Sequence, residues 1–328
     1  MKRHPSVEYH LLSRLKPLLN YHPSKSYPSG IGDDTVLRRC AGTERLVFTA
    51  DTFIENVHFR LDYMSLAEAG YKSMAAAVSD CAAAGSRPDG ALVQVGVPAG
   101  GTGTVVELYR GFNRLCRRYD FPIVGGDLSR SPCWMIAITV IGRMERASRP
   151  LMRTGIRNGD VLWCTGRPGR SAAGLALLSK LGRKRAEAAG AGLVRSHLKP
   201  RPRIDAGLIL SRCRAVHAAM DLSDGLSKDA ATLCHDNGLG LVLEIDALVT
   251  ADQRNAAARL RADPLSWVLH GGEDYELLFA AHRRFDPKAA GLDGCRRLGA
   301  FDRTLHGLSV HHGGEVVPVP AGSWDHLR

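Results

Sequence analysis

Aspartates that follow glycines or apolar segments are the residues of this chain best suited to chemistry. The first are Asp33 and Asp34, in the segment GIGDD at residues 30–34. Glycine and aspartate favour tight turns, so a turn alone would account for the pair. Two adjacent carboxylates behind glycines would equally suit a metal or phosphate site. The rest of the sequence has to decide between these two interpretations.

Three further aspartates end apolar segments that are typical of strands. Asp51 ends RLVFTAD, Asp127 ends FPIVGGD and Asp221 ends AVHAAMD. Open α/β folds bind ligands at strand ends, so we expect these acids to converge on one edge of a sheet. A divalent cation would relieve their mutual repulsion, and oxygen ligands favour Mg²⁺. The pattern therefore predicts a magnesium site.

Asp80 is the only charged residue between Lys72 and Arg87, in a segment rich in alanine that predicts a helix. An unpaired buried carboxylate is costly, and the helix macrodipole disfavours an anion near the C-terminus. A positive partner, such as a metal ion, should therefore face Asp80. The alternative is that Asp80 points into solvent.

Two more acidic segments stand before regular elements. Asp221 and Asp224 flank Ser223 at the entry to a predicted helix, and HGGEDYELLFA at residues 270–280 places two acids before a predicted strand. A helix cap and a solvated turn would explain them singly. The chain lacks a P-loop, a protein-kinase catalytic loop and a serine nucleophile elbow. If it uses a nucleoside triphosphate, aspartates and metal ions must do the work.

The elements that must position these acids alternate between strand and helix patterns, which predicts an α/β (α+β) fold. Predicted strands span residues 45–51, 90–98, 121–127, 134–142, 160–166, 239–245 and 275–281. Predicted helices span residues 65–84, 104–119, 171–180, 203–213 and 223–236. A chain of 328 residues exceeds the usual size of one core, and residues 146–160 are polar and rich in turn formers. We therefore expect an N-terminal domain at 1–147 and a C-terminal domain at 148–328.

The net charge of +11 makes a polyanion a possible partner. Its basic groups, such as GRKR at 182–185 and KPRPR at 199–203, carry no nucleic-acid motif, and only 6% of the residues are aromatic. A solvated basic surface or small phosphorylated ligands explain the charge better than nucleic acid does. The eight cysteines show no metal-site or disulfide spacing. No apolar run of membrane-spanning length and no signal peptide is evident, so we expect a cytoplasmic protein.

Eight motifs occur in a fixed order from about residue 30 to the C-terminus. They are GIGDD, FTADTFIENVHF, YKSMAAAVSDCAAAGSRP, YRGFNRLCRRYDFPIVGGDLSRSP, RTGIRNGDVLWCTGRPGRSAAGL, HLKPRPRIDAGL, DLSDGLSKDA and GGEDYELLF. In this order they resemble the thiamine-monophosphate kinases, whose superfamily also holds aminoimidazole ribonucleotide synthetase and selenophosphate synthetase. The resemblance implies the two-domain fold of that superfamily, with an N-terminal mixed sheet and helices that form the ATP site and a homodimer, and a C-terminal α/β domain. It also implies transfer of the γ-phosphoryl group of ATP to thiamine monophosphate.

The resemblance assigns roles to residues of this chain. The implied Mg²⁺ ligands are Asp34, Thr49, Ala50 through its backbone oxygen, Asp51, Asp80, Asp127, Asp221 and Asp224. The implied ATP contacts are Tyr109, Gly126, Asp127, Arg153 and Ser223. The implied contacts to thiamine monophosphate are His58, Glu273 and Trp324. No catalytic residue beyond the metal ligands is implied, which suits phosphoryl transfer, where positioning and charge neutralisation dominate.

The chain departs from the family pattern at Ala50, where threonine is usual, and at Ala77, where asparagine is usual. These changes keep the acids and alter their surroundings. Two alternatives stay open: an ATP-dependent relative acting on another small substrate, and a non-catalytic basic protein that binds nucleic acid. The retained substrate positions argue against the first, and the six retained aspartates argue against the second.

Overall fold

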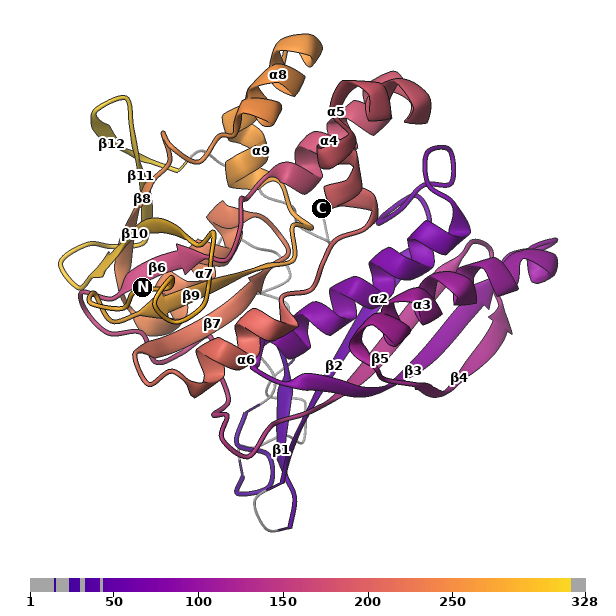
Figure 1. Ribbon diagram of the computed structural model, residues 1–328, viewed down its shortest axis with the longest axis horizontal. Helices are drawn as coiled ribbons and strands as arrows, with labels where there is room; N and C mark the ends of the chain where they lie inside the picture. The colour runs from indigo at the N-terminus through magenta and orange to yellow at the C-terminus, as the bar shows by residue number, and fades with distance from the viewer. Residues whose placement is uncertain (1–14, 16–23, 30–32, 42–43, 320–328) are drawn as a thin grey trace.

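Two β-sheets, one from each half of the chain, form the framework of the molecule (Figure 1). The computed structural model describes residues 15, 24–29, 33–41 and 44–319. The first sheet has the strand order β1-β2-β5-β3-β4 and the second the order β12-β11-β8-β10-β6-β9-β7. The pairs β3–β4 and β8–β11 are parallel and the other neighbouring pairs are antiparallel. Both sheets are therefore mixed, which confirms the α/β (α+β) prediction.

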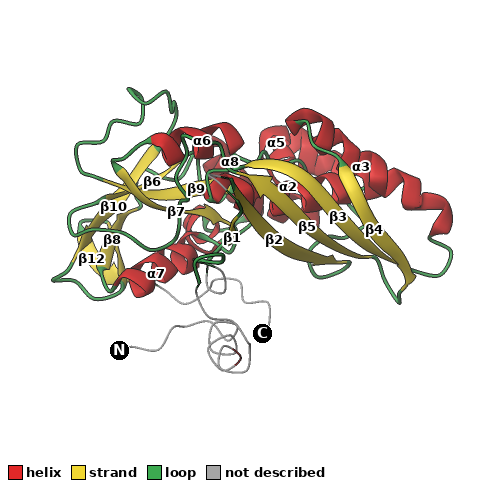
Figure 2. Cartoon of the chain, turned by 90° about the horizontal axis from the view of Figure 1, so that it is seen from below, coloured by secondary structure: helices red, strands yellow, loops and turns green. Residues whose placement is uncertain are grey.

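The N-terminal half contributes the first sheet and the helices on it. Its strands are β1 (Val36–Arg39), β2 (Arg45–Ile54), β3 (Arg87–Val97), β4 (Ile123–Arg130) and β5 (Met135–Arg143). Its helical elements are α2 (Leu66–Ala83), the short η2 (Thr102–Thr104) and α3 (Val105–Tyr119). Helices α2 and α3 lie on one face of the sheet, and the view in Figure 2 looks onto the other face. The helices predicted at 65–84 and 104–119 are confirmed.

The C-terminal half contributes the second sheet and most of the helices. Its strands are β6 (Val161–Cys164), β7 (Val216–Leu222), β8 (Gly240–Glu244), β9 (Glu276–Ala281), β10 (Arg296–Asp302), β11 (Leu308–His312) and β12 (Glu315–Pro318). Its helices are α4 (Arg170–Leu181), α5 (Arg183–Leu198), α6 (Ile204–Arg212), α7 (Leu226–Asn237), α8 (Ala251–Leu260) and α9 (Pro264–His270). Helix α7 begins three residues later than the predicted helix at 223–236, because residues 223–225 form a loop.

Helix α2 joins the two halves, because it packs on β2 and β5 of the first sheet and on β7 of the second. It begins at a capping box, in which Ser65 and Glu68 satisfy each other's backbone N–H groups. Small residues allow close packing along the helix. A Cβ on Gly70 would lie 2.3 Å from the backbone oxygen of Leu108 on α3, so only glycine fits there. This helix therefore holds Asp80 at a fixed place between the sheets.

The predicted strand ends at Asp51 and Asp127 are wrong. Strand β2 continues to Ile54, because its residues pair without interruption with β5, and Asp51 lies opposite Ile138. Asp127 lies inside β4, which continues to Arg130. Asp221 lies in the other sheet, so the three acids do not share one sheet edge.

The boundary between domains at residues 147 and 148 stays a prediction. Among the described residues, no helix combines the length and the apolar character needed to span a membrane.

Candidate active site

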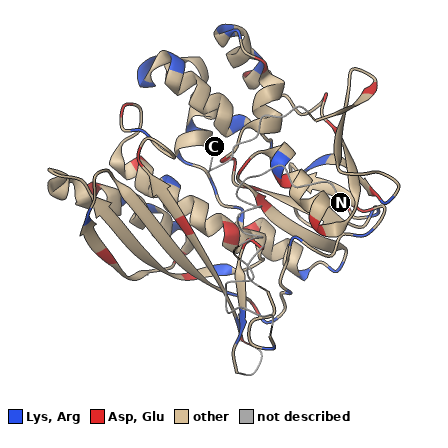
Figure 3. Cartoon of the chain, turned by 180° about the vertical axis from the view of Figure 1, so that it is seen from behind, with Lys and Arg blue, Asp and Glu red and all other residues tan. Residues whose placement is uncertain are grey.

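Three carboxylates from distant parts of the sequence meet where the two halves join. Asp34 precedes β1, Asp80 lies in the last turn of α2 and Asp221 lies on β7, and one oxygen of each falls within 4.8 Å of the others. Acidic segments are close together at this junction in Figure 3. We call these three residues the acidic cluster. Among the described residues no basic side chain forms an ion pair with Asp80, and the charges that act on it most are those of Asp51, Asp221 and Asp34.

Burial and mutual repulsion oppose the charges of the acidic cluster. The pKa of Asp80 is raised well above its ordinary value by burial and by the charges of Asp51, Asp221 and Asp34. Burial and the charge of Asp34 likewise raise the pKa of Asp221. Three acids held in this way would bind a cation strongly.

Arg153 supplies positive charge to one side of the cluster. Its guanidinium donates to Oδ1 of Asp34, with the Nε at 2.7 Å. Burial opposes the charge of Arg153, but the contacts with Asp34 raise its pKa above the ordinary value. The other oxygen of Asp34, Oδ2, is buried and has no hydrogen-bond partner among the described residues. One acceptor of the cluster is thus left for a ligand.

Strand β2 adds two more oxygen-bearing side chains beside the cluster. Thr49 donates a hydrogen bond from Oγ1 to Oδ2 of Asp80. Asp51 shares the face of β2 with Thr49, because alternate residues of a strand point the same way, and its charge acts on both Asp80 and Asp221. Ala50 points to the opposite, exposed face, so only its backbone could serve a metal.

Asp33 precedes Asp34 and makes a contact that is typical of a turn. Its Oδ1 accepts a hydrogen bond from the backbone N–H of Asp34 at 3.0 Å. Burial and the charge of Asp34 raise the pKa of Asp33 to about 7. The glycines of GIGDD lie outside the described residues.

The loop after β7 carries Ser223 and Asp224 and is tied down by Asp229. The backbone N–H groups of Ser223 and Asp224 donate to Oδ2 of Asp229, at 3.1 and 3.2 Å. Lys228 lies 2.6 Å from Oδ2 of Asp224. Asp229 was not predicted as a site residue, although the motif DLSDGLSKDA contains it. Its burial behind the loop is a tertiary feature that its spacing does not reveal.

A second polar group lies along α2, two turns before Asp80. Nζ of Lys72 is 2.8 Å from Oε1 of Glu273 and 3.3 Å from Nε2 of His197. Lys72 is only 1% exposed, and so is the His197 side chain. Burial and the charge of Lys72 lower the pKa of His197 well below its ordinary value. A neutral His197 accepts from Lys72 at Nε2, which leaves the proton on Nδ1, 3.1 Å from Oγ of Ser171.

Glu273 itself has a backbone φ of 65°, in the left-handed region that non-glycine residues rarely adopt. Its N–H donates to the backbone oxygen of Ser223 at 2.7 Å, which joins the two loops. The Glu273 side chain is 25% exposed while its partner Lys72 is buried. Glu273 thus combines a strained backbone, a partly exposed carboxylate and an ion pair with the buried Lys72. This combination is typical of a ligand-binding residue.

Lys72 was missed as a functional residue, although the sequence offered a signal. It is the charge that opens the otherwise uncharged stretch up to Asp80, and a buried lysine needs a partner.

His58 lies at the end of the first sheet. Its Nδ1 accepts from the backbone N–H of Ile54 at 3.1 Å, and its ring meets that of Phe53 edge-on with centroids 5.4 Å apart. Trp324, the third predicted substrate contact, lies outside the described residues.

Asp127 does not join the acidic cluster within one chain. Across the sheet, Asp127 on β4 is aligned with Gln94 on β3, with Ala137 on β5 and with Thr52 on β2. Thr52 is the neighbour of Asp51 in the sequence. Three strand spacings separate the backbones of Asp127 and Thr52, about 14 Å. Directly opposed residues share a face, so Asp127 points to the side away from Asp51. Gly126 precedes Asp127 on β4, and Tyr109 packs on Phe112 of α3 with ring centroids 5.2 Å apart.

The possible ligands here are the carboxylates of the acidic cluster and the adjacent hydroxyl of Thr49, a set of oxygens that suits a hard cation such as Mg²⁺ better than a transition metal. Buried acids with an unfilled acceptor oxygen are consistent with that ion.

Known proteins resemble this chain over nearly its whole length. The family descriptions "AIR synthase related protein, N-terminal domain" and "AIR synthase related protein, C-terminal domain" match residues 32–144 and 157–282. The thiamine-monophosphate kinase of Salmonella typhimurium is 35% identical over 91% of this chain and 92% of its own length. That of Bacillus subtilis is 31% identical over 82% of each.

Solved structures agree with these matches. The structure described as AaThiL complexed with AMPPCP and TMP has a TM-score of 0.84 and 29% identity, and covers 99% of both chains. Escherichia coli HypE, a hydrogenase maturation protein, has a TM-score of 0.69 at 18% identity over 84% of this chain and 85% of its own, which shows a shared fold alone.

Proposed function

This chain belongs to the thiamine-monophosphate kinase family, and we propose on that premise that it transfers the γ-phosphoryl group of ATP to thiamine monophosphate. The products are thiamine diphosphate and ADP. The observation that carries the proposal is the acidic cluster, Asp34, Asp80 and Asp221, with oxygens within 4.8 Å of one another. Two anionic substrates repel each other, and cations held by such a cluster would neutralise both.

We propose that several Mg²⁺ ions bind at this cluster. Asp34, Asp80 and Asp221 would hold them, with Asp51 and Thr49 beside them on β2. The buried Oδ2 of Asp34 supports this assignment, because it has no hydrogen-bond partner among the described residues. When bound, Mg²⁺ supplies charge neutralisation at the phosphate oxygens. Asp224 and the backbone oxygen of Ala50 complete the proposed set within one chain.

The remaining residues of the site position the substrates. Arg153 presents a planar guanidinium that suits a triphosphate oxygen, and Ser223 lies on the adjoining loop. Glu273, held by Lys72, would offer a carboxylate to the cationic thiamine group, and His58, at the end of β2, is the second proposed contact to thiamine monophosphate. No side chain of this set is needed as a covalent nucleophile.

We further propose that the enzyme acts as a homodimer in which β4 of one copy serves the site of the other. Within one chain Asp127 lies about 14 Å from the region of Asp51, too far to share an ion with it. The outer edge of β4 pairs with no strand among the described residues, and its Val124 and Leu128 are 58% and 57% exposed. An exposed apolar edge strand favours pairing with a second copy. Asp127, Gly126 and Tyr109 would then act across the interface.

A direct assay tests the proposed reaction. Purified protein is incubated with Mg²⁺, ATP and thiamine monophosphate, and thiamine diphosphate is followed by chromatography. We expect product that depends on Mg²⁺ and disappears with EDTA. If ADP forms only with another acceptor, the chain is a relative with a different small substrate. If no acceptor is phosphorylated but RNA binds, the nucleic-acid alternative is favoured. The cytoplasmic location stays a prediction.

A further inference from the structure

We propose that a second, basic cavity in the C-terminal half binds a compact anion with two or more phosphate groups, apart from the acidic cluster. The cavity has a volume of about 550 Å³, within the range of small-molecule sites. Four segments line it: the loop at 165–170, the stretch from Gly192 to Arg203, the segment at 274–276 and the loop at 293–296. It shares no lining residue with the acidic cluster.

The charge of the lining strongly favours an anion. Its basic side chains are Arg167, Arg170, Arg195, Lys199, Arg201, Arg203 and Arg296. The acids are three in number: Asp274, Glu276 and Asp293. So many cations in one concave surface repel each other, and a bound anion would relieve that repulsion.

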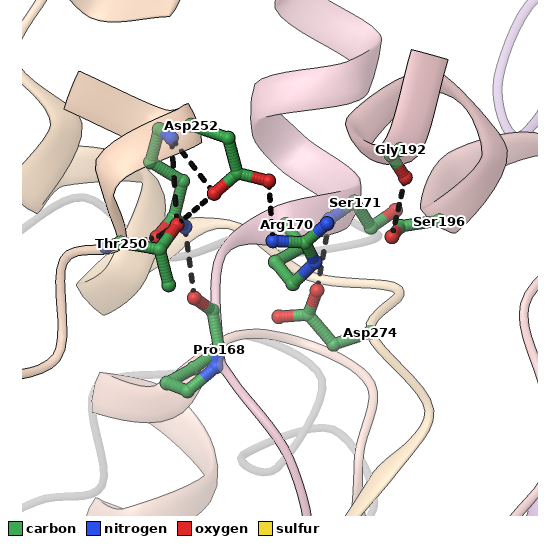
Figure 4. Close-up of polar contacts among 9 residues, drawn as sticks. Pro168, Arg170, Ser171, Gly192, Ser196, Thr250, Asp252 and Asp274 are labelled. Carbon is green, nitrogen blue, oxygen red and sulfur yellow. Dashed lines mark hydrogen bonds and ion pairs between the residues drawn. The ribbon is translucent and has the colours of Figure 1, made fainter. Parts of the chain in front are cut away.

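Three of the cations are anchored by carboxylates. Arg170 donates to Asp252 of α8 at 2.6 Å, as Figure 4 shows, and Lys199 lies 3.4 Å from Glu68 of α2. Arg203 is paired with Glu276. These contacts fix the walls of the cavity.

Two of the acids are turned toward protein donors. Asp274 accepts from the backbone N–H groups of Gly169 and Ser171 at the start of α4, the latter at 2.9 Å (Figure 4). Glu276 accepts from Oγ1 of Thr165 at 2.6 Å. The N-terminus of α4 is thus already occupied by Asp274, and the ligand would be held by side chains.

The exposed arginines supply the free donors. Arg167, Arg195 and Arg296 are exposed and have no ion-pair partner among the described residues. A guanidinium offers paired donors that match the oxygens of a phosphate group. They come from three separate segments of the wall, so a ligand with two or more phosphate groups could contact all of them at once.

The lining also favours a small inorganic or aliphatic ligand over nucleic acid. None of the lining residues is aromatic, so the cavity offers no aromatic ring on which a base could stack. The sequence KPRPR, which has no role in the proposed reaction, supplies four of the lining residues, Lys199, Pro200, Arg201 and Arg203.

The test is a calorimetric titration of the full chain with sodium pyrophosphate in EDTA at low ionic strength. Without Mg²⁺ the acidic cluster repels the probe, so binding there does not contribute. We expect one saturable site, weakened at least about tenfold in the double variant Arg195→Ala with Arg296→Ala. The matched control is Arg185→Ala, which removes another exposed arginine of α5 outside the cavity and should leave the affinity unchanged. Circular dichroism verifies that each variant is folded.

Further arms separate the possible sources of the anion. If ADP binds as tightly as pyrophosphate, the cavity recognises the diphosphate end of a larger ligand. If ADP binds more weakly than pyrophosphate, the cavity recognises a free inorganic anion. Either result supports the proposed site. The KM values for ATP and thiamine monophosphate should stay within about twofold in the double variant. Absence of saturable binding, equal weakening by Arg185→Ala, or a large change in either KM would overturn a separate anion site.

Discussion

Asp80 shows how a single residue can favour function over stability. Burial and the charges of Asp51 and Asp221 raise its pKa, so its charge is held at a cost to the fold. We expect Asp80→Asn to lower kinase activity roughly 100-fold or more, because a metal ligand is lost. In EDTA the melting temperature should stay level or rise, because repulsion is relieved. Stabilisation by Mg²⁺, measured by thermal unfolding, should disappear.

The control for this substitution is Asp89→Asn, since Asp89 is exposed and its ion-pair partner within the described part of the chain is the surface residue Arg143. Near-normal activity of Asp80→Asn would mean that the acidic cluster is not the reaction centre.

Lys72 is a second single residue whose substitution should alter function, because it positions Glu273. Its buried ammonium holds Glu273 at 2.8 Å, so Lys72→Met leaves that carboxylate without its cation. We expect KM for thiamine monophosphate to rise about tenfold, while KM for ATP changes less, as initial rates would measure. Lys184→Met removes an exposed lysine of α5 and serves as control. Equal increases in both KM values would indicate general misfolding of the site instead.

Helices and strands were predictable where the apolar pattern is strong and unbroken. The capped, alanine-rich α2 follows its prediction closely. Helix α5 was missed, because it begins with basic residues and contains Gly190, whose backbone is not helical. The strand containing Asp51 was ended too early, because an aspartate usually interrupts strands. Pairing with β5 overrides that local preference.

Glu68 ties α2 to α5, and its pKa gives a pH-dependent prediction. Burial opposes its charge, but the contacts with Arg183 and Ser65 outweigh burial and lower the pKa of Glu68 below its ordinary value. A lowered carboxylate pKa stabilises the fold above the unfolded value, and this stability is lost as pH falls through the folded value. We expect Glu68→Gln, which can retain the cap, to lose about 1 kcal/mol near pH 7. In urea unfolding, the difference should shrink below about pH 4.5, and a constant difference would contradict this origin.

The relative positions of the site residues depend on the fold of the whole molecule, and the sequence predicted them only in part. Motif order identified Asp34, Asp80 and Asp221 as site residues, and they meet. The prediction that Asp51, Asp127 and Asp221 gather at one sheet edge failed, because Asp221 lies in the second sheet, which α2 packs against the first. The position of Asp127 depends on strand register, which no local pattern specifies.

The proposed homodimer gives a prediction that can be tested by mixing two inactive variants. If Asp127 of one copy completes the site of the other, Asp51→Asn and Asp127→Asn are each inactive as homodimers. Coexpressed, half of the dimers would be mixed, and each mixed dimer would contain one site with both aspartates intact. Activity should therefore recover to about a quarter of the wild-type level. A second variant, Leu128→Lys on the exposed strand β4, should give monomers in analytical ultracentrifugation and lose activity. If the wild-type protein is dimeric but the coexpressed variants regain no kinase activity, Asp127 does not act across the interface.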